Sequence, residues 1–283
     1  KQGTTEPVGT GQFGDIAAVS PETVIDLPEL DGTYEIVMTA TGEGVPTEPV
    51  VKTFVRRRYE WEHNDLGKST TVYRPFTPIE VEGKMLRTVL REHQLSDSGL
   101  LDGVTATGKQ MLARPMAFSV TVDGAATPVW AAPLSFSTQA PHIVTTESRL
   151  SAGAFSAAGR GTWDYDGTLK YELELLPSAG KAVDELTLEI PVVDAIAPQM
   201  HAMKEGIRRG PVSVTLPDGE GVIWDSGKLA EGDMPNGFCS YIFLGSALRG
   251  LCWFAENDRN WSWDRKAPAV ELVRSGGVLA LRV

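Results

Sequence analysis

Aromatic and polar side chains gather in two irregular stretches of the chain, and both stretches could do chemistry. The first covers residues 61–65 and the second covers residues 256–264, where acids and amides stand between tryptophans. Aromatic rings stack on the apolar faces of sugars, while carboxylates and amides hydrogen-bond sugar hydroxyls. We therefore predict carbohydrate contacts here, and the alternative is that buried tryptophans support the two loops. The candidate residues are Trp61, His63, Asn64, Asp65, Glu256, Asn257, Trp261 and Trp263.

Two pairs of acids could act on a glycosidic bond, a reaction in which one carboxyl group is protonated and the other is ionised. The pairs are Asp164 with Asp166 and Glu256 with Asp258. Residues two apart on a strand share a face, but both pairs lie beside Gly or Asn in turn-like sequence, where solvated acids are common. We therefore expect turn acids here and predict no catalytic residue in this chain.

Histidine chemistry has little support in the sequence. The four histidines, His63, His93, His142 and His201, are accompanied by no Gly-x-Ser-x-Gly elbow, and the chain has no phosphate-binding glycine loop and no CxxC pair. We therefore expect no nucleophilic triad, no metal site and no cofactor.

The most apolar stretch of the chain predicts a hairpin with strands at 238–244 and 251–255. Both strands are almost continuously apolar, so we expect both of their faces to be covered. The polar turn residues centre near Ala247 and Leu248, which places Cys252 opposite Phe243 and roughly 13 Å along the strand from Cys239. The two cysteines are therefore predicted to be buried free thiols.

Turn signals recur about every ten residues from residue 79 onward, and the 29 Gly and 18 Pro follow no period. This rhythm predicts an all-β protein built around a large antiparallel β-sandwich or barrel. Residues 169–175 alternate strictly enough for a strand with one solvated face. The one helical signal is the spacing of Met200, Met203 and Ile207, which permits one or two helical turns between residues 198 and 210.

The chain divides into two expected modules. Residues 33–40 and 50–58 predict a hairpin of a small β module, and Pro75 and Pro78 impose an extended path on the crossover that follows. We place the modules at 1–58 and 59–283. The abrupt start and the strand-like end are what a piece of a longer protein would show.

Composition and charge restrict the partners. The chain has 283 residues, of which 42% are hydrophobic, and a net charge of -11. An acidic surface disfavours nucleic acid and anionic membranes, and the short run at 56–58 is better explained as a solvated strand end. No apolar run has transmembrane length, and no signal peptide opens the sequence, which leaves the compartment unknown.

Several motifs, in order along the chain, resemble the non-catalytic N-terminal β region of bacterial proteins similar to glycoside hydrolase family 123. They are WEHNDLGK at 61–68, PFTPIEVEG at 75–83, GKQMLARP at 108–115, WDYDGTLK at 163–170, MH at 200–201, GVIWDS at 221–226 and YIFLG…RGLCWFAEND at 241–258. The resemblance implies a β-sandwich or supersandwich similar to galactose-mutarotase-like domains, and it favours a secreted or periplasmic parent protein. In such proteins the region precedes a TIM-like barrel with an adjacent Asp-Glu pair that cleaves N-acetylhexosaminides. That barrel and its catalytic pair are absent from this chain.

Three hypotheses follow from the sequence. The leading one is an accessory all-β region of a glycoside hydrolase, which supports a catalytic barrel and contacts carbohydrate. The second is a free-standing glycosidase or lyase, which would require His63 or His201 to converge with acids in one cleft. The third is a structural or protein-interaction β-sandwich, which an exposed apolar face would favour.

Overall fold

The described part of the chain is all-β, as the sequence predicts. Antiparallel strands make up its regular structure, and the single helical element among the described residues is a 3-10 turn, η1 (Asp194–Ile196). None of those residues belongs to a helix that could cross a membrane. The structure, a computed structural model, describes residues 1–13, 23–42, 44–153, 155–176, 183–203, 211–227, 238–257, 261 and 268–283.

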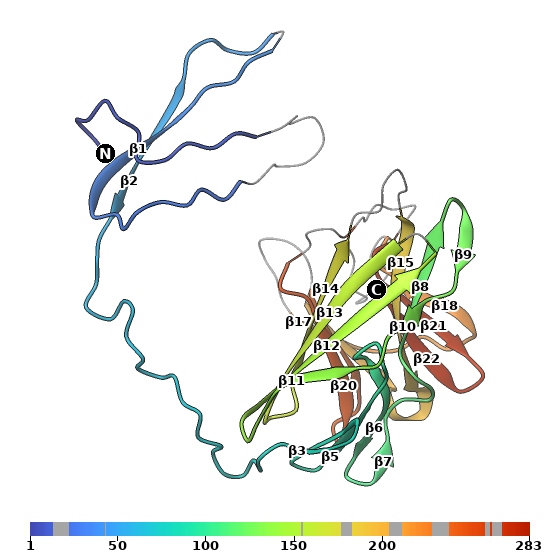
Figure 1. Ribbon diagram of the computed structural model, residues 1–283. Coiled ribbons are helices and arrows are strands. Elements are labelled where there is room, and N and C mark those ends of the chain that lie inside the picture. Colours follow the sequence, from blue (N-terminus) through green and yellow to red (C-terminus); the bar gives the residue numbers. More distant parts are fainter. Residues whose placement is uncertain are drawn as a thin grey trace. The chain divides into compact units, whose positions relative to one another are not determined.

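The chain forms two compact units, Lys1–Ser69 and Thr70–Val283. In the first unit, β1 (Gly32–Met38) and β2 (Val50–Arg56) form the antiparallel hairpin that the sequence predicts (Figure 1). The Tyr34 ring stacks on Phe54 at 5.7 Å between centroids and is buried. The module boundary between residues 58 and 59 stays a prediction.

The described residues of the second unit form four antiparallel sheets, named here by their strands. The β3–β7 sheet runs in chain order through β3 (Glu80–Glu82), β4 (Met85–Thr88), β5 (Arg91–Leu95), β6 (Leu101–Ala106) and β7 (Lys109–Gln110). The β10–β14 sheet has the order β10 (Trp130–Ala131), β12 (Ile143–Ala152), β13 (Phe155–Asp164), β14 (Leu169–Leu176), with β11 (Ser135–Ala140) also paired to β12. The β8–β22 sheet has the order β18 (Gly221–Asp225), β21 (Glu271–Ser275), β22 (Val278–Arg282), β15 (Val183–Val193), β8 (Ala117–Val122), β9 (Ala125–Thr127). The β16–β20 sheet has the order β17 (Pro211–Thr215), β16 (Gln199–Met203), β19 (Tyr241–Gly245), β20 (Gly250–Phe254).

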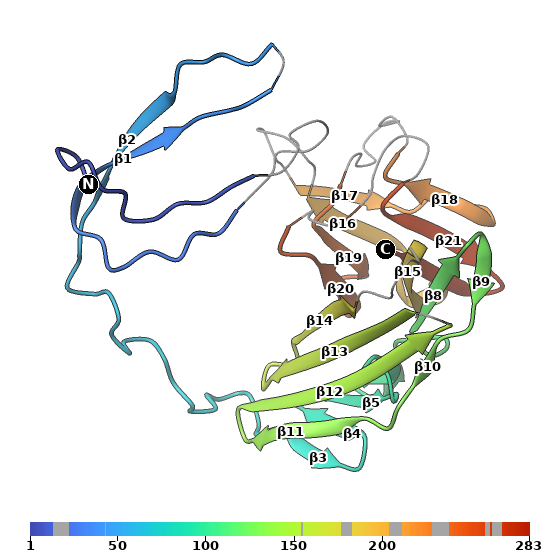
Figure 2. The same ribbon diagram turned by 45° about the horizontal axis from the view of Figure 1, so that its top comes forward.

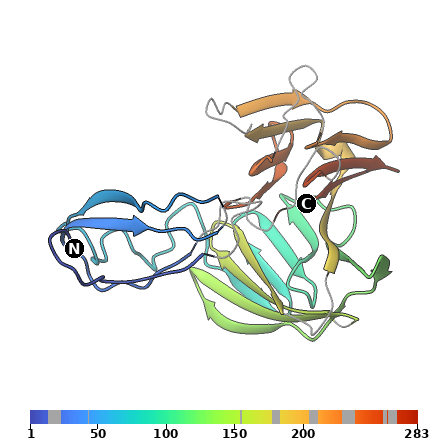
Figure 3. The same cartoon turned by 90° about the horizontal axis from the view of Figure 1, so that it is seen from above.

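One hydrophobic core joins the four sheets. In Figures 2 and 3 the β10–β14 sheet lies on one side of the second unit, and the strands β16, β17, β18 and β21 lie on the opposite side. Alternating residues of each sheet point inward, because side chains on a strand alternate between faces. Fully buried members come from every sheet and include Leu86, Leu95, Val144, Trp163, Ile242, Leu244, Leu272 and Leu281. Truncating one of these to alanine would cost about 2–5 kcal/mol.

A tyrosine joins the β10–β14 sheet to the β3–β7 sheet. Tyr171 lies on β14, and its hydroxyl donates to the carbonyl of Ser98, in the β5–β6 connection, at 2.7 Å. Gly159 on the neighbouring strand makes room for this side chain, since a Cβ there would lie 2.9 Å from the ring carbon Cζ. The pKa of Tyr171 is raised, chiefly by burial, so its hydroxyl stays protonated and able to donate.

The hairpin predicted around the two cysteines has the predicted register. The prediction that both faces of both strands are buried is wrong. Phe243 pairs with Cys252 and Gly245 pairs with Gly250, and both cysteines are free, as expected. Cys239 is buried, but Cys252 is exposed. The reason is that β20 is the outer strand of its sheet in the described order, so its outward residues Cys252 and Phe254 face solvent.

Two local predictions have opposite outcomes. The helical turn expected at 198–210 is wrong where the chain is described, because Gln199–Met203 forms β16 between β17 and β19; residues 204–210 lie outside the described residues. Apolar residues at every third position suit a helix, but hydrogen-bonded pairing with a strand on each side outweighs that spacing here. By contrast, the half-solvated strand expected at 169–175 is confirmed, since half-buried and exposed residues alternate from Leu169 to Glu174 of β14.

Candidate functional site

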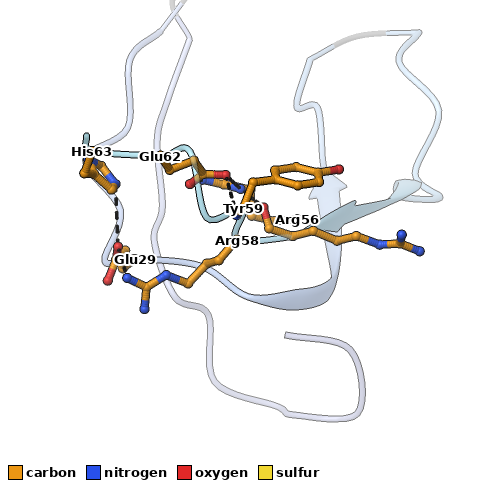
Figure 4. A network of polar contacts seen from close by, with 7 residues as sticks. Glu29, Arg56, Arg58, Tyr59, Glu62 and His63 are labelled. Atoms are coloured by element: carbon orange, nitrogen blue, oxygen red, sulfur yellow. Dashed lines mark hydrogen bonds and ion pairs between the residues drawn. The ribbon is translucent and has the colours of Figure 1, made fainter. Parts of the chain in front are cut away.

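The first candidate segment begins where β2 ends, in the first unit. Arg56, the last residue of β2, forms an ion pair with Glu62, with a hydrogen bond from Nη1 to Oε1 of 2.8 Å. The same Oε1 accepts a hydrogen bond from the backbone N–H of Tyr59 at 3.1 Å. These bonds close a turn over residues 59–62 (Figure 4). The hydrogen bond from Arg56 lowers the pKa of Glu62, which keeps the carboxylate ionised.

An aromatic pair stands on this turn. The rings of Tyr59 and Trp61 stack at 5.1 Å between centroids with 13° between their planes. Trp61 is 67% exposed and Tyr59 is 50% exposed. Monomeric proteins tend to bury large rings, so two stacked rings in solvent mark a surface suited to a ligand. Trp61 was identified from the sequence, whereas Tyr59 and Glu62 were missed; the Tyr-x-Trp-Glu order was the available signal.

The other predicted residues of this segment have different surroundings. His63 is 75% exposed at its side chain, and its Nε2 lies 3.6 Å from Glu29, which also pairs with Arg58 at 2.7 Å (Figure 4). The Asn64 amide bonds backbone on both sides, donating to the Trp61 carbonyl and accepting from Leu66 N–H at 2.8 Å. Asn64 therefore shapes the turn.

The last member of this segment, Asp65, is exposed. Its carboxylate accepts a hydrogen bond from Lys68 Nζ at 2.9 Å. An exposed ion pair of this kind is worth little to stability, so both groups can exchange their partner for a ligand at small cost.

The second candidate segment belongs to the second unit and is mostly aromatic packing. The rings of Phe238, Trp253 and Trp261 meet edge-on or tilted, at 5.6–6.5 Å between centroids. Both tryptophans are partly buried and pack against the hydrophobic core. For Trp253 and Trp261 the support of a loop therefore fits better than an open sugar platform. Trp263 lies outside the described residues.

The polar residues of the second segment are on the surface. Glu256 and Asn257 are both exposed. The pKa of Lys170 is raised by its hydrogen bond to Glu172 and, to a smaller extent, by the charge of Glu256. Glu256 therefore lies near β14, the outer strand of the β10–β14 sheet.

Among the described residues, the candidate acids do not form a pair suited to acid-base catalysis. Asp164 is the last residue of β13, and Asp166 lies in the turn between β13 and β14, where its Oδ1 accepts from Thr168 N–H at 2.7 Å. The turn position is therefore confirmed for Asp166, while Asp164 stands at the end of the strand. Asp258, the predicted partner of Glu256, lies outside the described residues. Within the described ranges, no three His, Cys, Asp or Glu side chains are placed to hold a metal ion.

The fold and the candidate segments can now be compared with known proteins. Residues 79–215 match the family model described as glycoside hydrolase 123, third domain. Over these residues the chain is similar to a domain of glycoside hydrolase 123 proteins. The matched part starts just before β3 and ends with β17, so it lies within the second unit. No curated protein matches the chain.

Proposed function

We propose that this chain is a non-catalytic accessory region of a glycoside hydrolase 123-like protein, which contacts carbohydrate and serves a catalytic barrel carried elsewhere in the parent protein. The family match supports the accessory part of this proposal. The exposed Tyr59–Trp61 stack is the observation that supports carbohydrate contact.

The chemistry of the stack suits a sugar. Sugar rings carry C–H groups on their flat faces, and these pack against the electron-rich faces of tyrosine and tryptophan. The Arg56–Glu62 ion pair and the Tyr59 N–H bond hold the turn before any ligand arrives. A surface ordered in advance loses less conformational entropy on binding. Asp65, Lys68 and His63 supply polar groups within the same turn region.

Carbohydrate contact is tested by Trp61→Ala and Tyr59→Ala in the full chain. Binding of neutral oligosaccharides, measured by isothermal titration calorimetry, should fall at least about tenfold in both variants, which corresponds to roughly 1.4 kcal/mol. The matched control is Trp130→Ala, because Trp130 is 72% exposed on β10 in the second unit. Unchanged affinity in Trp61→Ala would contradict the proposal that the stack binds sugar.

The absence of catalysis has its own test. The purified chain should not turn over aryl N-acetylhexosaminides. His63 has Glu29 as its acidic neighbour, and His201 Nδ1 bonds Ser213 Oγ at 2.7 Å. Those surroundings favour the accessory hypothesis over the free-standing glycosidase. Turnover that disappears in Glu256→Gln would overturn it.

One observation favours protein interaction as a second function. The β1–β2 hairpin exposes apolar residues along both strands, namely Ile36, Val37, Met38, Val50, Val51 and Val55. Exposed apolar residues in such number are typical of a surface that another protein covers. Replacing Val37 and Val51 with threonine should abolish co-purification with the parent protein's barrel, supplied as a separate chain. Binding that is unaffected by the double variant would leave the sugar-binding proposal as the better one.

A further inference from the structure

Several strands of the second unit contain glycine, and the space beside each glycine can be filled by another group of the protein or stay open. Glycine weakens a strand, so its presence calls for a reason, such as a positive φ or the close approach of another group. Among the described strand residues of this unit, the glycines without a positive φ are Gly103, Gly159, Gly161, Gly245 and Gly250.

Four of these glycines make room for a group of the protein. Tyr171 lies over Gly159, and a Cβ on Gly161 would lie 2.5 Å from Thr146 Oγ1. The Phe243 ring lies over both Gly245 and Gly250, where a Cβ would overlap its Cζ atom and would also meet a backbone carbonyl oxygen, of Arg249 at 2.5 Å and of Leu244 at 2.6 Å respectively. Each of these glycines is therefore explained by internal packing.

Gly103, in the middle of β6, differs. A Cβ here would meet one atom within 4 Å, Nε2 of Gln110 at 3.1 Å, and that atom is the tip of a flexible side chain. Neither backbone conformation nor a fixed neighbour requires glycine at this position. What the missing side chain leaves is open space on the outer face of the β3–β7 sheet.

That space is a hollow of about 230 Å³. Its walls are Met85 on β4, Glu92 and Gln94 on β5, Asp102 and Thr105 on β6, and Gln110 on β7. The strand register explains the set. Gly103 pairs with Gln94 and Gln94 pairs with Met85, while the next row joins Glu92, Thr105 and Gln110. The neighbouring inward residues His93, Leu95 and Val104 are buried, so the hollow faces outward.

The polar groups of the hollow are partly ordered and partly open. Thr105 donates to Gln110 Oε1 at 3.1 Å, which turns the amide nitrogen toward Gly103. Glu92 accepts from Arg87 Nε at 3.3 Å. The irregular register between Gln94 and Leu95 leaves Asp102 as the extra residue of β6, and no hydrogen bond or ion pair within the described part of the chain engages its carboxylate.

We propose that this hollow binds one neutral sugar ring, as a second carbohydrate contact in addition to the Tyr59–Trp61 stack. Two carboxylates disfavour an anionic ligand, while carboxylate, amide and hydroxyl groups together match neighbouring sugar hydroxyls. Met85 supplies an apolar wall. Pockets for drug-sized ligands run about 300–1,000 Å³, so a hollow of this volume suits a single ring. The inference rests on the proposed function, namely that this accessory region contacts carbohydrate.

Gly103→Val is the deciding variant, because it fills the hollow without harming the strand. The φ of Gly103 lies outside the left-handed region and valine favours strands, so the variant should unfold no earlier than the parent chain. Saturation-transfer NMR with maltohexaose, cellohexaose and N-acetylglucosamine hexamer should show at least about tenfold weaker binding of the preferred sugar. Asp102→Asn should weaken it less. Ser119→Val, an exposed residue of β8, is the control for an added surface valine and should change nothing.

The outcomes separate this inference from the proposed function. If binding is lost in Trp61→Ala and retained in Gly103→Val, the proposal that the hollow binds sugar is wrong and the proposal for the stack is supported. If binding is lost in Gly103→Val and retained in Trp61→Ala, the proposal that the hollow binds sugar is supported and the proposal for the stack is wrong. No binding of any of the three sugars by the parent chain contradicts both.

Discussion

His93 is a buried histidine without a full set of partners. It lies on β5, is 4% exposed, and its ring packs against the Trp163 ring at 4.8 Å between centroids. Its Nε2 lies 3.2 Å from Thr88 Oγ1, while Nδ1 has no hydrogen-bond partner in the part of the chain that the structure describes. Burial lowers the pKa of His93 from 6.5 to about 4, and the charge of Arg91 adds to the shift.

We expect His93 to make the chain less stable in acid. Between pH 6.5 and 4 the unfolded chain binds a proton at His93 while the folded chain does not, so protonation favours unfolding. The loss begins as the pH falls below 6.5, reaches about 3 kcal/mol near pH 4 and then levels off. Urea denaturation at several pH values should show this slope in the parent chain and a shallower one in His93→Leu. His201→Gln is the control that keeps the slope, and equal slopes in parent chain and His93→Leu would refute the prediction.

At the scale of single residues, the sequence could predict chemistry but not exposure. Trp61 and Trp261 have similar neighbours in sequence, with acids and amides beside them. Trp61 stands in solvent on a turn held by Arg56 and Glu62, whereas Trp261 packs on Phe238 and the core. Contacts between residues far apart in the chain decide this difference, and a local pattern does not contain them.

Among the elements, β13 and β14 depend on a matched glycine and tyrosine. Gly159→Ala should lower the free energy of unfolding by about 1–3 kcal/mol, because the new Cβ would overlap Tyr171. Tyr171→Phe should cost about 1 kcal/mol through the lost bond to Ser98. Urea denaturation of both single variants and the double variant measures the coupling between them. Since removing the hydroxyl relieves part of the overlap, the double variant should be more stable than the sum predicts, and strict additivity would contradict the contact.

Element type was predictable where strands alternate or carry clear turns. Residues 169–175 alternate in polarity, and the turn at 245–250 fixed the pairing of Phe243 with Cys252. The prediction failed at 199–203, where the spacing of Met200 and Met203 suits a helix and pairing with β17 and β19 produces a strand. The prediction that both faces of β20 are buried also failed. The fold decides which strands flank β20 within its sheet, and a local pattern does not contain that information.

The whole molecule divides its apolar burial unevenly. All residues of the large core cluster lie between Ile79 and Val283, inside the second unit. A chain of residues 70–283 should therefore fold alone and melt within about 3 °C of the full chain, a shift that corresponds to about 1 kcal/mol at this size. Differential scanning calorimetry of both chains is the measurement. A drop of more than about 10 °C would show that residues 1–69 stabilise the second unit.

The all-β architecture and the glycoside hydrolase 123 relationship were both within reach of the sequence. The regular spacing of turn residues and the order of the motifs are signals spread along the chain. A wrong prediction for one element therefore leaves the predicted fold class and family resemblance unchanged. The supersandwich and galactose-mutarotase-like descriptions remain predictions. The hollow at Gly103 was out of reach, because its walls come from four strands whose register a linear pattern does not give.

The Phe243 ring, which lies over Gly245 and Gly250, also limits how this hairpin can evolve. Any side chain at either glycine would collide with the ring, so a family in which position 243 stays aromatic should keep glycine at both ends of the turn. Where position 243 shrinks to valine or alanine, glycine is still required at both positions, because a Cβ at 245 would lie 2.5 Å from the Arg249 carbonyl oxygen and one at 250 would lie 2.6 Å from the Leu244 carbonyl oxygen. The two glycines should therefore persist whatever residue stands at position 243, while Ala247 and Leu248 at the tip of the turn drift independently of them.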